Sequence, residues 1–396
     1  MFDNIIGNRT TVSRLEREIR TGTVAHSMLF TGNDYTGKLT CALETARVLN
    51  CGESGEWGCS CRSCRESRLL KNPYLFLTGL YSGLYEIRLT GGLLKASDNE
   101  ANRVKFIRAV RKLTLRIDRR FLPEDELKKI SADVLTDVYT GIERIAAKQF
   151  VSEDDRLDVI DAVISGAEKL ALTVPSSFSV NTVRNLSAAA YAGVDGKKVI
   201  IIENADTLSA SAANALLKIL EEPPSDTYFI LTAVRQNAVL PTVLSRLRVF
   251  PFSDRTPSEE SVLLKLFFAC TESVSLYDFI LKHSGWDITV LNRSVSSFFE
   301  MLASETGPVD FYRSPLMKWP DRGLFVLFWE KLSQTLRYRF ADGTDGNPHK
   351  LQLYTAIQRV LNDGKTALNE AHQAPEAVIE ASFFTIRSIL EKGQSA

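Results

Sequence analysis

Gly32, Gly37 and Lys38 have the Gly-x4-Gly-Lys spacing of a phosphate-binding loop. In such a loop the backbone N–H groups surround the phosphates, the lysine adds a positive charge, and a following hydroxyl holds magnesium. Leu39 stands where that hydroxyl belongs. Thr40 is no simple substitute, because one helix position turns a side chain by about 100°. The loop predicts phosphate contact without a magnesium ligand, and the other interpretation is a chance occurrence of this spacing.

A second group of polar residues follows the apolar run 199–202, where Glu203 and Asn204 end a predicted strand. In phosphate-loop ATPases a carboxylate at this strand end supports the metal, and the next acidic residue polarises the attacking water. Glu203 keeps a carboxylate, but Asn204 is no general base. Taken alone, Asn204 is more simply a turn residue after a core strand. Together with Leu39, it favours loss of ATP hydrolysis.

Four cysteines, Cys51, Cys59, Cys61 and Cys64, lie within fourteen residues. Four thiolates at such spacing can close a tetrahedral zinc site with bonds of about 2.3 Å. The Cys61-x2-Cys64 pair has the usual chelating spacing, whereas Cys59-x-Cys61 is tighter than the common one. We expect a structural zinc site, and the alternative is four reduced thiols around a loop.

These residues need a parallel α/β sheet to position them. Met28–Phe30 is a short apolar strand that leads into the glycine-rich loop, and the residues after Lys38 have helical apolar spacing. A helix capped by Ser209 and stopped by Pro223-Pro224 follows the 199–202 strand. Further strands are predicted at 229–232 and 249–252. Strands that alternate with helices indicate a parallel sheet.

The chain has 396 residues, of which 44% are apolar, with 48 basic and 48 acidic residues. The length allows two or three domains, and the zero formal charge favours protein partners over nucleic-acid binding by the whole chain. We see no basic leader and no apolar run of about 18 residues, so we expect a cytoplasmic protein. Helical patterns dominate after Pro257. We expect domains at 1–252, 253–306 and 307–396.

Five segments carry a family resemblance: Phe2–Asn8, Ala25–Phe30, the cysteine module, Asn214–Pro224 and Leu240–Arg246. In this order they resemble the AAA+ clamp-loader family of bacterial DNA polymerase III, and within it the delta-prime subunits. The resemblance covers residues 1–78 and 180–252. It implies an AAA+ module (a parallel sheet with flanking helices), a small helical lid and a C-terminal helical collar.

The resemblance also implies roles for single residues. Arg246 would be an arginine finger supplied in trans to a neighbouring subunit, although Leu247 replaces the Cys that follows this Arg in the family. The lid's sensor arginine has no counterpart in His283–Asp287. A degenerate nucleotide site, with ATP binding left open, would comprise Gly32, Gly37, Lys38, Thr40, Glu203 and Thr232.

As a function, the resemblance implies a non-hydrolysing stator of the replicative clamp loader, a component of the DNA-directed DNA polymerase III holoenzyme that is no enzyme by itself. Its implied partners are the gamma/tau ATPase, the delta subunit, the sliding clamp and, through the complex, primed DNA. One alternative is an ATP-hydrolysing gamma/tau-type subunit. Another is a zinc-containing nucleic-acid adaptor that only shares the fold.

Residues from about 80 to 175 are predicted to be mostly helical, and the resemblance does not extend to them. One predicted helix there is basic, and we expect a solvated helix face, the alternative being contact with DNA phosphates. Its basic residues are Arg103, Lys105, Arg108, Arg111, Lys112, Arg116, Arg119 and Arg120. Acidic residues of the same insertion could neutralise them, namely Glu124, Asp125, Glu126, Glu153, Asp154 and Asp155.

Overall fold

The chain forms two compact units, Met1–Gly285 and Trp286–Ala396, in the computed structural model. The described residues are 1–79, 81, 83–175, 178–192, 196–272, 274–283, 288–304, 308–313, 317, 325, 328–329, 331–333, 335–336, 348–369 and 374–394. Residues 284–287, where the sequence lacks a sensor arginine, lie outside them. We describe each unit by itself.

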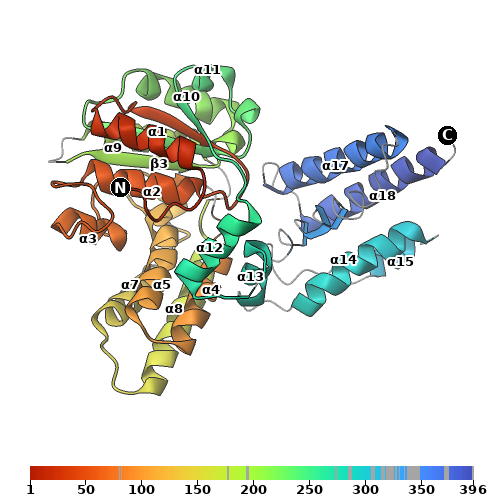
Figure 1. The fold of residues 1–396 in the computed structure, drawn as a ribbon, viewed down its shortest axis with the longest axis horizontal. Coiled ribbons are helices and arrows are strands. Elements are labelled where there is room, and N and C mark those ends of the chain that lie inside the picture. The colour runs from red at the N-terminus through yellow and green to blue at the C-terminus, as the bar shows by residue number, and fades with distance from the viewer. Residues whose placement is uncertain are drawn as a thin grey trace. The chain divides into compact units, whose positions relative to one another are not determined.

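A five-stranded sheet with the order β2-β3-β4-β1-β5 forms the centre of the first unit (Figure 1). All neighbouring strands are parallel, which confirms the predicted α/β sheet. The sequence analysis did not predict the edge strand β2. The strands are β1 (Ser27–Thr31), β2 (Leu75–Gly79), β3 (Lys198–Glu203), β4 (Thr227–Ala233) and β5 (Arg248–Pro251).

Helices cover both faces of the sheet. Successive side chains of each strand point to opposite faces, and apolar side chains on both faces pack against these helices. Met28 and Ile201 pack with α1 (Arg9–Arg20) and α2 (Lys38–Leu49) in one apolar cluster. Leu29 and Ile200 belong to a second cluster on the opposite face, with α9 (Val180–Tyr191) and α10 (Ala210–Glu221). Burial on both faces explains why these strands are almost uninterrupted apolar runs.

The insertion is helical, as predicted, and its core is continuous with that of the sheet. Phe106, Ile142 and Ile160 pack in the same cluster as Phe76 of β2. Figure 1 shows α5, α7 and α8 extending from the sheet as a bundle. The helices are α4 (Leu84–Ala96), α5 (Glu100–Thr114), α6 (Glu124–Leu127), α7 (Ala132–Ala147) and α8 (Glu153–Ala171), with a short 3-10 turn, η1 (Leu115–Ile117).

The prediction that the basic residues of the insertion form a solvated face is wrong for three of its arginines. Arg103, Arg111 and Arg116 are 7%, 5% and 4% exposed. They pair with Asp98, Glu143 and Glu203, none of which belongs to the acids predicted to neutralise them. A buried guanidinium needs a carboxylate partner because its desolvation is costly. The fold therefore uses these charges internally.

Two further helices of the first unit pack on the insertion. Leu89 of α4 lies in one apolar cluster with Leu264 of α12 (Pro257–Phe268) and with Phe279 of α13 (Leu276–His283). Two shorter helices, α3 and α11, lie near the predicted functional residues. They are α3 (Arg62–Arg68) and α11 (Pro241–Leu244), and the remaining 3-10 turns are η2 (Ala205–Thr207) and η3 (Gln236–Ala238).

The described part of the second unit is helical. Its helices are α14 (Ile288–Ala303), α15 (Pro308–Arg313), α17 (Pro348–Asn369) and α18 (Pro375–Gln394). Aromatic side chains join them, since the rings of Phe311 and Phe383 stack with centroids 4.4 Å apart. Residue 286 begins this unit, so α14 lies with the C-terminal helices. The division into lid and collar stays a prediction.

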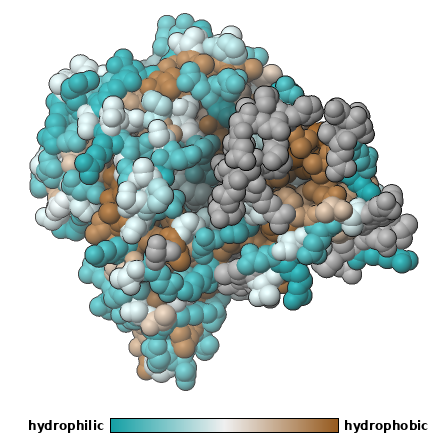
Figure 2. Space-filling model, turned by 45° about the vertical axis from the view of Figure 1, so that its right-hand side comes forward, coloured by the Kyte–Doolittle hydropathy of each residue, from teal (hydrophilic) through white to brown (hydrophobic). Residues whose placement is uncertain are grey.

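Among the described residues, none of the helices combines the length and apolar character that a membrane span requires. On the face drawn in Figure 2, hydrophilic residues predominate, with hydrophobic areas between them. Exposed apolar side chains such as Val151, Leu172 and Leu266 accordingly lie on different segments of the first unit.

Candidate functional site

The glycine-rich loop connects β1 to α2, as predicted. Gly37 is the N-cap of α2 and has a φ of 98°, a left-handed conformation that glycine adopts without strain. Gly32 has a φ of 143°, and a Cβ there would lie 2.1 Å from the Phe252 carbonyl oxygen. The Lys38 Nζ donates hydrogen bonds to the carbonyls of Gly32 and Asn33, at 2.5 and 2.6 Å. The lysine therefore binds the loop itself.

An arginine that the sequence analysis did not single out lies against this loop. The Arg255 Nε donates to the Ile6 carbonyl at 2.9 Å, and its guanidinium also donates to the Tyr35 carbonyl. A Cβ on Gly37 would lie 2.7 Å from Arg255 Nη2. Burial lowers the pKa of Arg255. No motif marks this residue, because its partners are far away in the sequence.

Two asparagines tie the same loop to the segment after β5. Asn8 Nδ2 donates to the Thr36 and Ser253 carbonyls, both at 3.2 Å. Asn33 Nδ2 donates to both carboxylate oxygens of Asp254 at 2.9 Å. The loop conformation is thus held by side chains of the chain itself.

The position of the missing magnesium ligand is apolar in the structure as well. Leu39 packs against the apolar cluster between α2 and the sheet. Thr40 follows it on α2 and is half-buried. Its predicted part in nucleotide binding stays a prediction, like that of Gly32, Gly37 and Lys38.

The strand-end carboxylate already has a partner. Glu203 ends β3 and forms an ion pair with Arg116 of the insertion. The Arg116 guanidinium also lies over the Tyr81 ring, 5.1 Å from its centroid. Burial lowers the pKa of Arg116 to about 10, so the side chain is still a cation at neutral pH. No local sequence pattern indicates this pair, which joins the insertion to the predicted nucleotide site.

The structure brings Asn204 and Thr232 together. The Asn204 backbone N–H donates to Thr232 Oγ1 at 3.2 Å, and Asn204 has a left-handed φ of 54°. Nearby Asp206 accepts from the Val234 N–H at 3.0 Å. Burial raises the pKa of Asp206, although hydrogen bonds from backbone N–H groups lower it in part. Asp206 thus links the ends of β3 and β4, a role that the sequence analysis missed.

Arg246 lies just after α11, with its side chain 29% exposed. Its Nη2 pairs with Glu221 Oε2 at 3.1 Å, and its Nη1 donates to the Thr242 carbonyl at 2.7 Å. Glu221 is the last residue of α10, within the Asn214–Pro224 segment. The guanidinium is accessible from solvent and held from one side.

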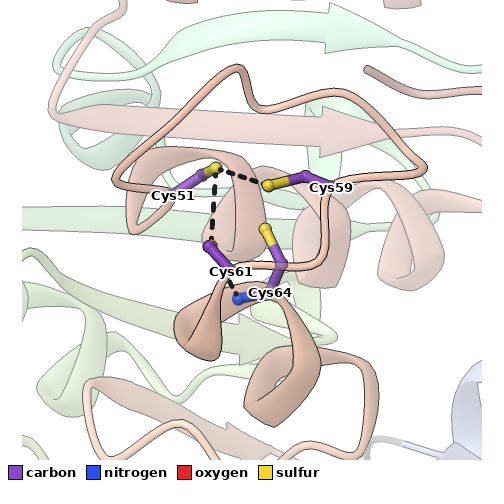
Figure 3. Close-up of side chains that lie close together, drawn as sticks. All are labelled: Cys51, Cys59, Cys61 and Cys64. Atoms are coloured by element: carbon purple, nitrogen blue, oxygen red, sulfur yellow. Dashed lines mark hydrogen bonds between the residues drawn. The ribbon is translucent and has the colours of Figure 1, made fainter.

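The four cysteines of the predicted metal site converge (Figure 3). Their sulfur atoms all lie within 4.8 Å of one another. Cys51 Sγ is 3.6 Å from Cys59 Sγ and 3.9 Å from Cys61 Sγ. Four sulfurs bound to one tetrahedral zinc at about 2.3 Å lie about 3.8 Å apart. The donor set fits a closed four-thiolate metal site.

Hydrogen-bond donors surround these sulfurs. Cys61 is the N-cap of α3, and its sulfur accepts from the Cys64 backbone N–H. Burial raises the pKa of Cys61, but hydrogen bonds from Cys64 and the other thiols outweigh this and lower it to about 7. Arg47 of α2 donates to Cys64 Sγ at 2.9 Å and is 1% exposed. The Arg47 donor favours the Cys64 thiolate that would bind metal, although burial still raises the pKa of Cys64 overall.

Comparison with known proteins gives a family for the segments that hold these residues. The family model described as "DNA polymerase III, delta subunit" matches residues 7–76 and 143–256. The DNA polymerase III subunit delta' of Haemophilus influenzae is 42% identical over 83 residues, which are 20% of this chain and 25% of that protein. Over these segments the chain is similar to clamp-loader proteins of the delta-prime type. The matched segments include the phosphate loop, the four cysteines, the β3 end and Arg246.

The chain is also similar to proteins of other DNA polymerase III subunit types. The DNA polymerase III subunit gamma/tau of Mycobacterium tuberculosis is 37% identical over 118 residues, covering 26% of this chain and 20% of that protein. A solved gamma subunit-related protein of Thermotoga maritima is 17% identical, with a TM-score of 0.27, over 54% of this chain and 80% of that chain. The chain spans 35%, 25% and 18% of the length of the first curated relatives it matches. The family model leaves out residues 77–142, which include Arg116.

Proposed function

We propose that this chain is a stator of the replicative clamp loader that hydrolyses no ATP itself. It supplies Arg246 to the ATP site of a neighbouring subunit and helps to load the sliding clamp onto primed DNA. In this role it is a component of the DNA polymerase III holoenzyme, beside gamma/tau-type ATPase and delta subunits. The proposal rests on the family of the matched segments and on the chemistry of the chain's own nucleotide site.

The observation that carries the proposal is the state of the three groups that magnesium-dependent hydrolysis needs. Leu39 is half-buried and packs against the core at the position where a hydroxyl would bind the ion. Glu203 is paired with a guanidinium, and Asn204 has an amide where a carboxylate would prepare the attacking water. These changes come from three separate segments of the chain: α2, the end of β3, and the insertion that contributes the arginine paired with Glu203. An ATPase subunit could not tolerate all of them.

Arg246 has the properties of a residue that acts on a neighbour. An arginine finger stabilises charge on the transferring phosphate and is worth about 10³–10⁵ in rate. In the pair of Arg246 with Glu221, Arg246 is partly exposed, at 29%, and Glu221 is exposed, at 59%. Exposed ion pairs contribute about 0–1 kcal/mol. Release of Arg246 from Glu221 on assembly would therefore cost little.

The metal that fits the cysteine set is zinc, held by Cys51, Cys59, Cys61 and Cys64. A site with four thiolates leaves no open coordination position, so zinc would stabilise the fold of the module and take no part in catalysis. The module follows directly on α2, whose first residue is Lys38. Zinc would thus fix the far end of the helix that begins at the phosphate loop.

A reconstituted clamp loader tests the proposal through Arg246→Ala. We expect the variant chain to fold and assemble normally, because an exposed pair is lost, and ATP turnover by the complex to fall. Arg248→Ala is the control. Arg248 lies two residues after Arg246 and is 49% exposed, and its buried partner Glu18 keeps its pair with Arg14. Equal turnover with both variants would contradict the proposal.

The similarity to gamma/tau subunits supports one alternative function, that of an ATP-hydrolysing clamp-loader subunit. The two functions differ in the isolated chain. A hydrolysing subunit would cleave ATP in a magnesium-dependent reaction that Lys38→Ala abolishes. The stator would show no turnover that depends on Lys38.

A further inference from the structure

The carboxylate at the end of β3 lies where a phosphate-loop ATPase would hold its magnesium. Glu203 is in register with Gly79 at the end of the edge strand β2. Its side chain is 16% exposed. Because the carboxyl ends of parallel strands meet at one edge of the sheet, ligands bind there. Glu203 is therefore the remaining candidate among the three groups for contact with a divalent cation.

Arg116 approaches this carboxylate from the insertion and is fixed from several sides. Its guanidinium pairs with Glu203, donates to the Lys112 carbonyl and lies over the Tyr81 ring. The preceding helix α5 is anchored by Phe106, which is fully buried, and by the pair of Arg111 with Glu143. A change in the Arg116 side-chain conformation would break these contacts.

With Arg116 in place, little enclosed space remains beside Glu203 for a hydrated ion. Glu203 and Arg116 border a cavity of about 20 Å³, whose wall also includes Leu122, Val174 and Phe178. A cavity of about 10–15 Å³ holds one water molecule. Magnesium usually keeps several of its waters and requires octahedral oxygen ligands. The residues present here do not fit that ion.

The charges of Glu203 and Arg116 also disfavour a divalent cation at this position. Glu203 and Arg116 together are neutral, so a divalent cation at Glu203 would displace the arginine and leave it buried without its counter-ion. Breaking a buried pair in this way would weaken cation binding by a factor on the order of 10²–10⁴. The residues that cause this come from 77–142, outside the segments that the family model matches.

We propose that Arg116 is an internal counter-ion that takes the place of the metal at Glu203. The insertion thereby neutralises the carboxylate at the end of β3 without magnesium. This assigns the insertion a role at the site, rather than a role in DNA binding. The inference builds on the proposed idle site but is independent of Arg246.

Metal binding by the isolated, zinc-loaded chain tests the inference, with MnCl2 as the probe and no nucleotide or partner present. We compare the wild type with Arg116→Met, which removes the charge at similar length. We expect Arg116→Met to bind Mn²⁺ at least tenfold more tightly than the wild type, and Arg116→Met/Glu203→Gln to lose this gain. Arg111→Met is the matched control, because Arg111 is equally buried but pairs with Glu143 on α7. It should bind Mn²⁺ like the wild type.

Thermal unfolding provides a second readout that remains available where a single variant folds poorly. Arg116→Met and Glu203→Gln each leave one buried charge unpaired, so each should lower the melting temperature. The double variant has neither charge, and it should melt at a higher temperature than either single variant. Additive losses, or no Mn²⁺ gain in a folded Arg116→Met chain, would overturn the inference. Neither readout involves Arg246, so a failed stator function would leave this result unaffected.

Discussion

Replacement of Arg47 by methionine should destabilise the first unit by about 3–5 kcal/mol, the usual cost of breaking a buried ion pair from one side. Arg47 is 1% exposed and its partner Glu44 is 5% exposed. The Arg47 Nε donates to Glu44 Oε1 at 2.7 Å, and its other nitrogens donate to the Gly55 and Glu56 carbonyls at 2.8 and 3.2 Å. Methionine fills a similar volume without any of these donors. Glu44 would then lack its hydrogen-bonded counter-ion.

Urea unfolding at pH 7.5 with zinc present measures this loss as a change in the free energy of unfolding. Trp57 gives a local fluorescence signal, since the Arg47 guanidinium lies 5.9 Å from its ring centroid. The double variant Glu44→Gln/Arg47→Met should recover part of the loss, because it carries no unpaired buried charge. Arg47 also donates to Cys64 Sγ, so chelator competition should show zinc affinity lowered by about 10–100-fold.

Arg62→Met is the matched control for this prediction. Arg62 belongs to the same module, is 86% exposed and pairs with Glu66. We expect it to cost less than about 1 kcal/mol, as exposed pairs do. If Arg47→Met were no more destabilising than Arg62→Met, the buried position of Arg47 and its support of the cysteine module would both be wrong.

Two further predictions concern zinc and ATP. The chain purified without chelators under reducing conditions should contain one zinc per molecule, and its removal should increase hydrogen exchange in residues 51–68; metal analysis that finds none would exclude the site. The isolated wild-type chain and its Lys38→Ala variant should cleave radiolabelled ATP at the same background rate, and faster cleavage by the wild type alone would show an active ATPase.

The sequence was sufficient to predict the elements that hold the phosphate loop and the β3 end. Helical spacing after Lys38 and the β-branched run before Glu203 are local signals, and the structure has α2 and β3 at these places. Ser209 also caps α10 as predicted, with its side chain accepting from the Ala212 N–H. The edge strand β2 was missed, because a short apolar run before a helical segment does not distinguish strand from helix.

The cysteine spacing indicated a metal site, and the structure brings the four sulfurs together. The residues around the candidate sites could not be predicted in this way. Arg116 and Arg255 bind partners that are distant in sequence, and only the fold brings these together. The basic helix illustrates the same limit. Its charges can be counted from the sequence, but their burial against carboxylates of other segments cannot.

The central claim is that this chain assists ATP hydrolysis in its neighbour while performing none itself. Pre-steady-state ATP cleavage by the reconstituted complex tests it most directly, because the burst counts active sites. With Arg246→Ala the burst should lose about one ATP per complex. With Arg246→Lys the burst should be slower, because lysine offers a point charge without the planar guanidinium. With Arg248→Ala the burst should be unchanged. An undiminished burst from a complex that contains Arg246→Ala would contradict the account.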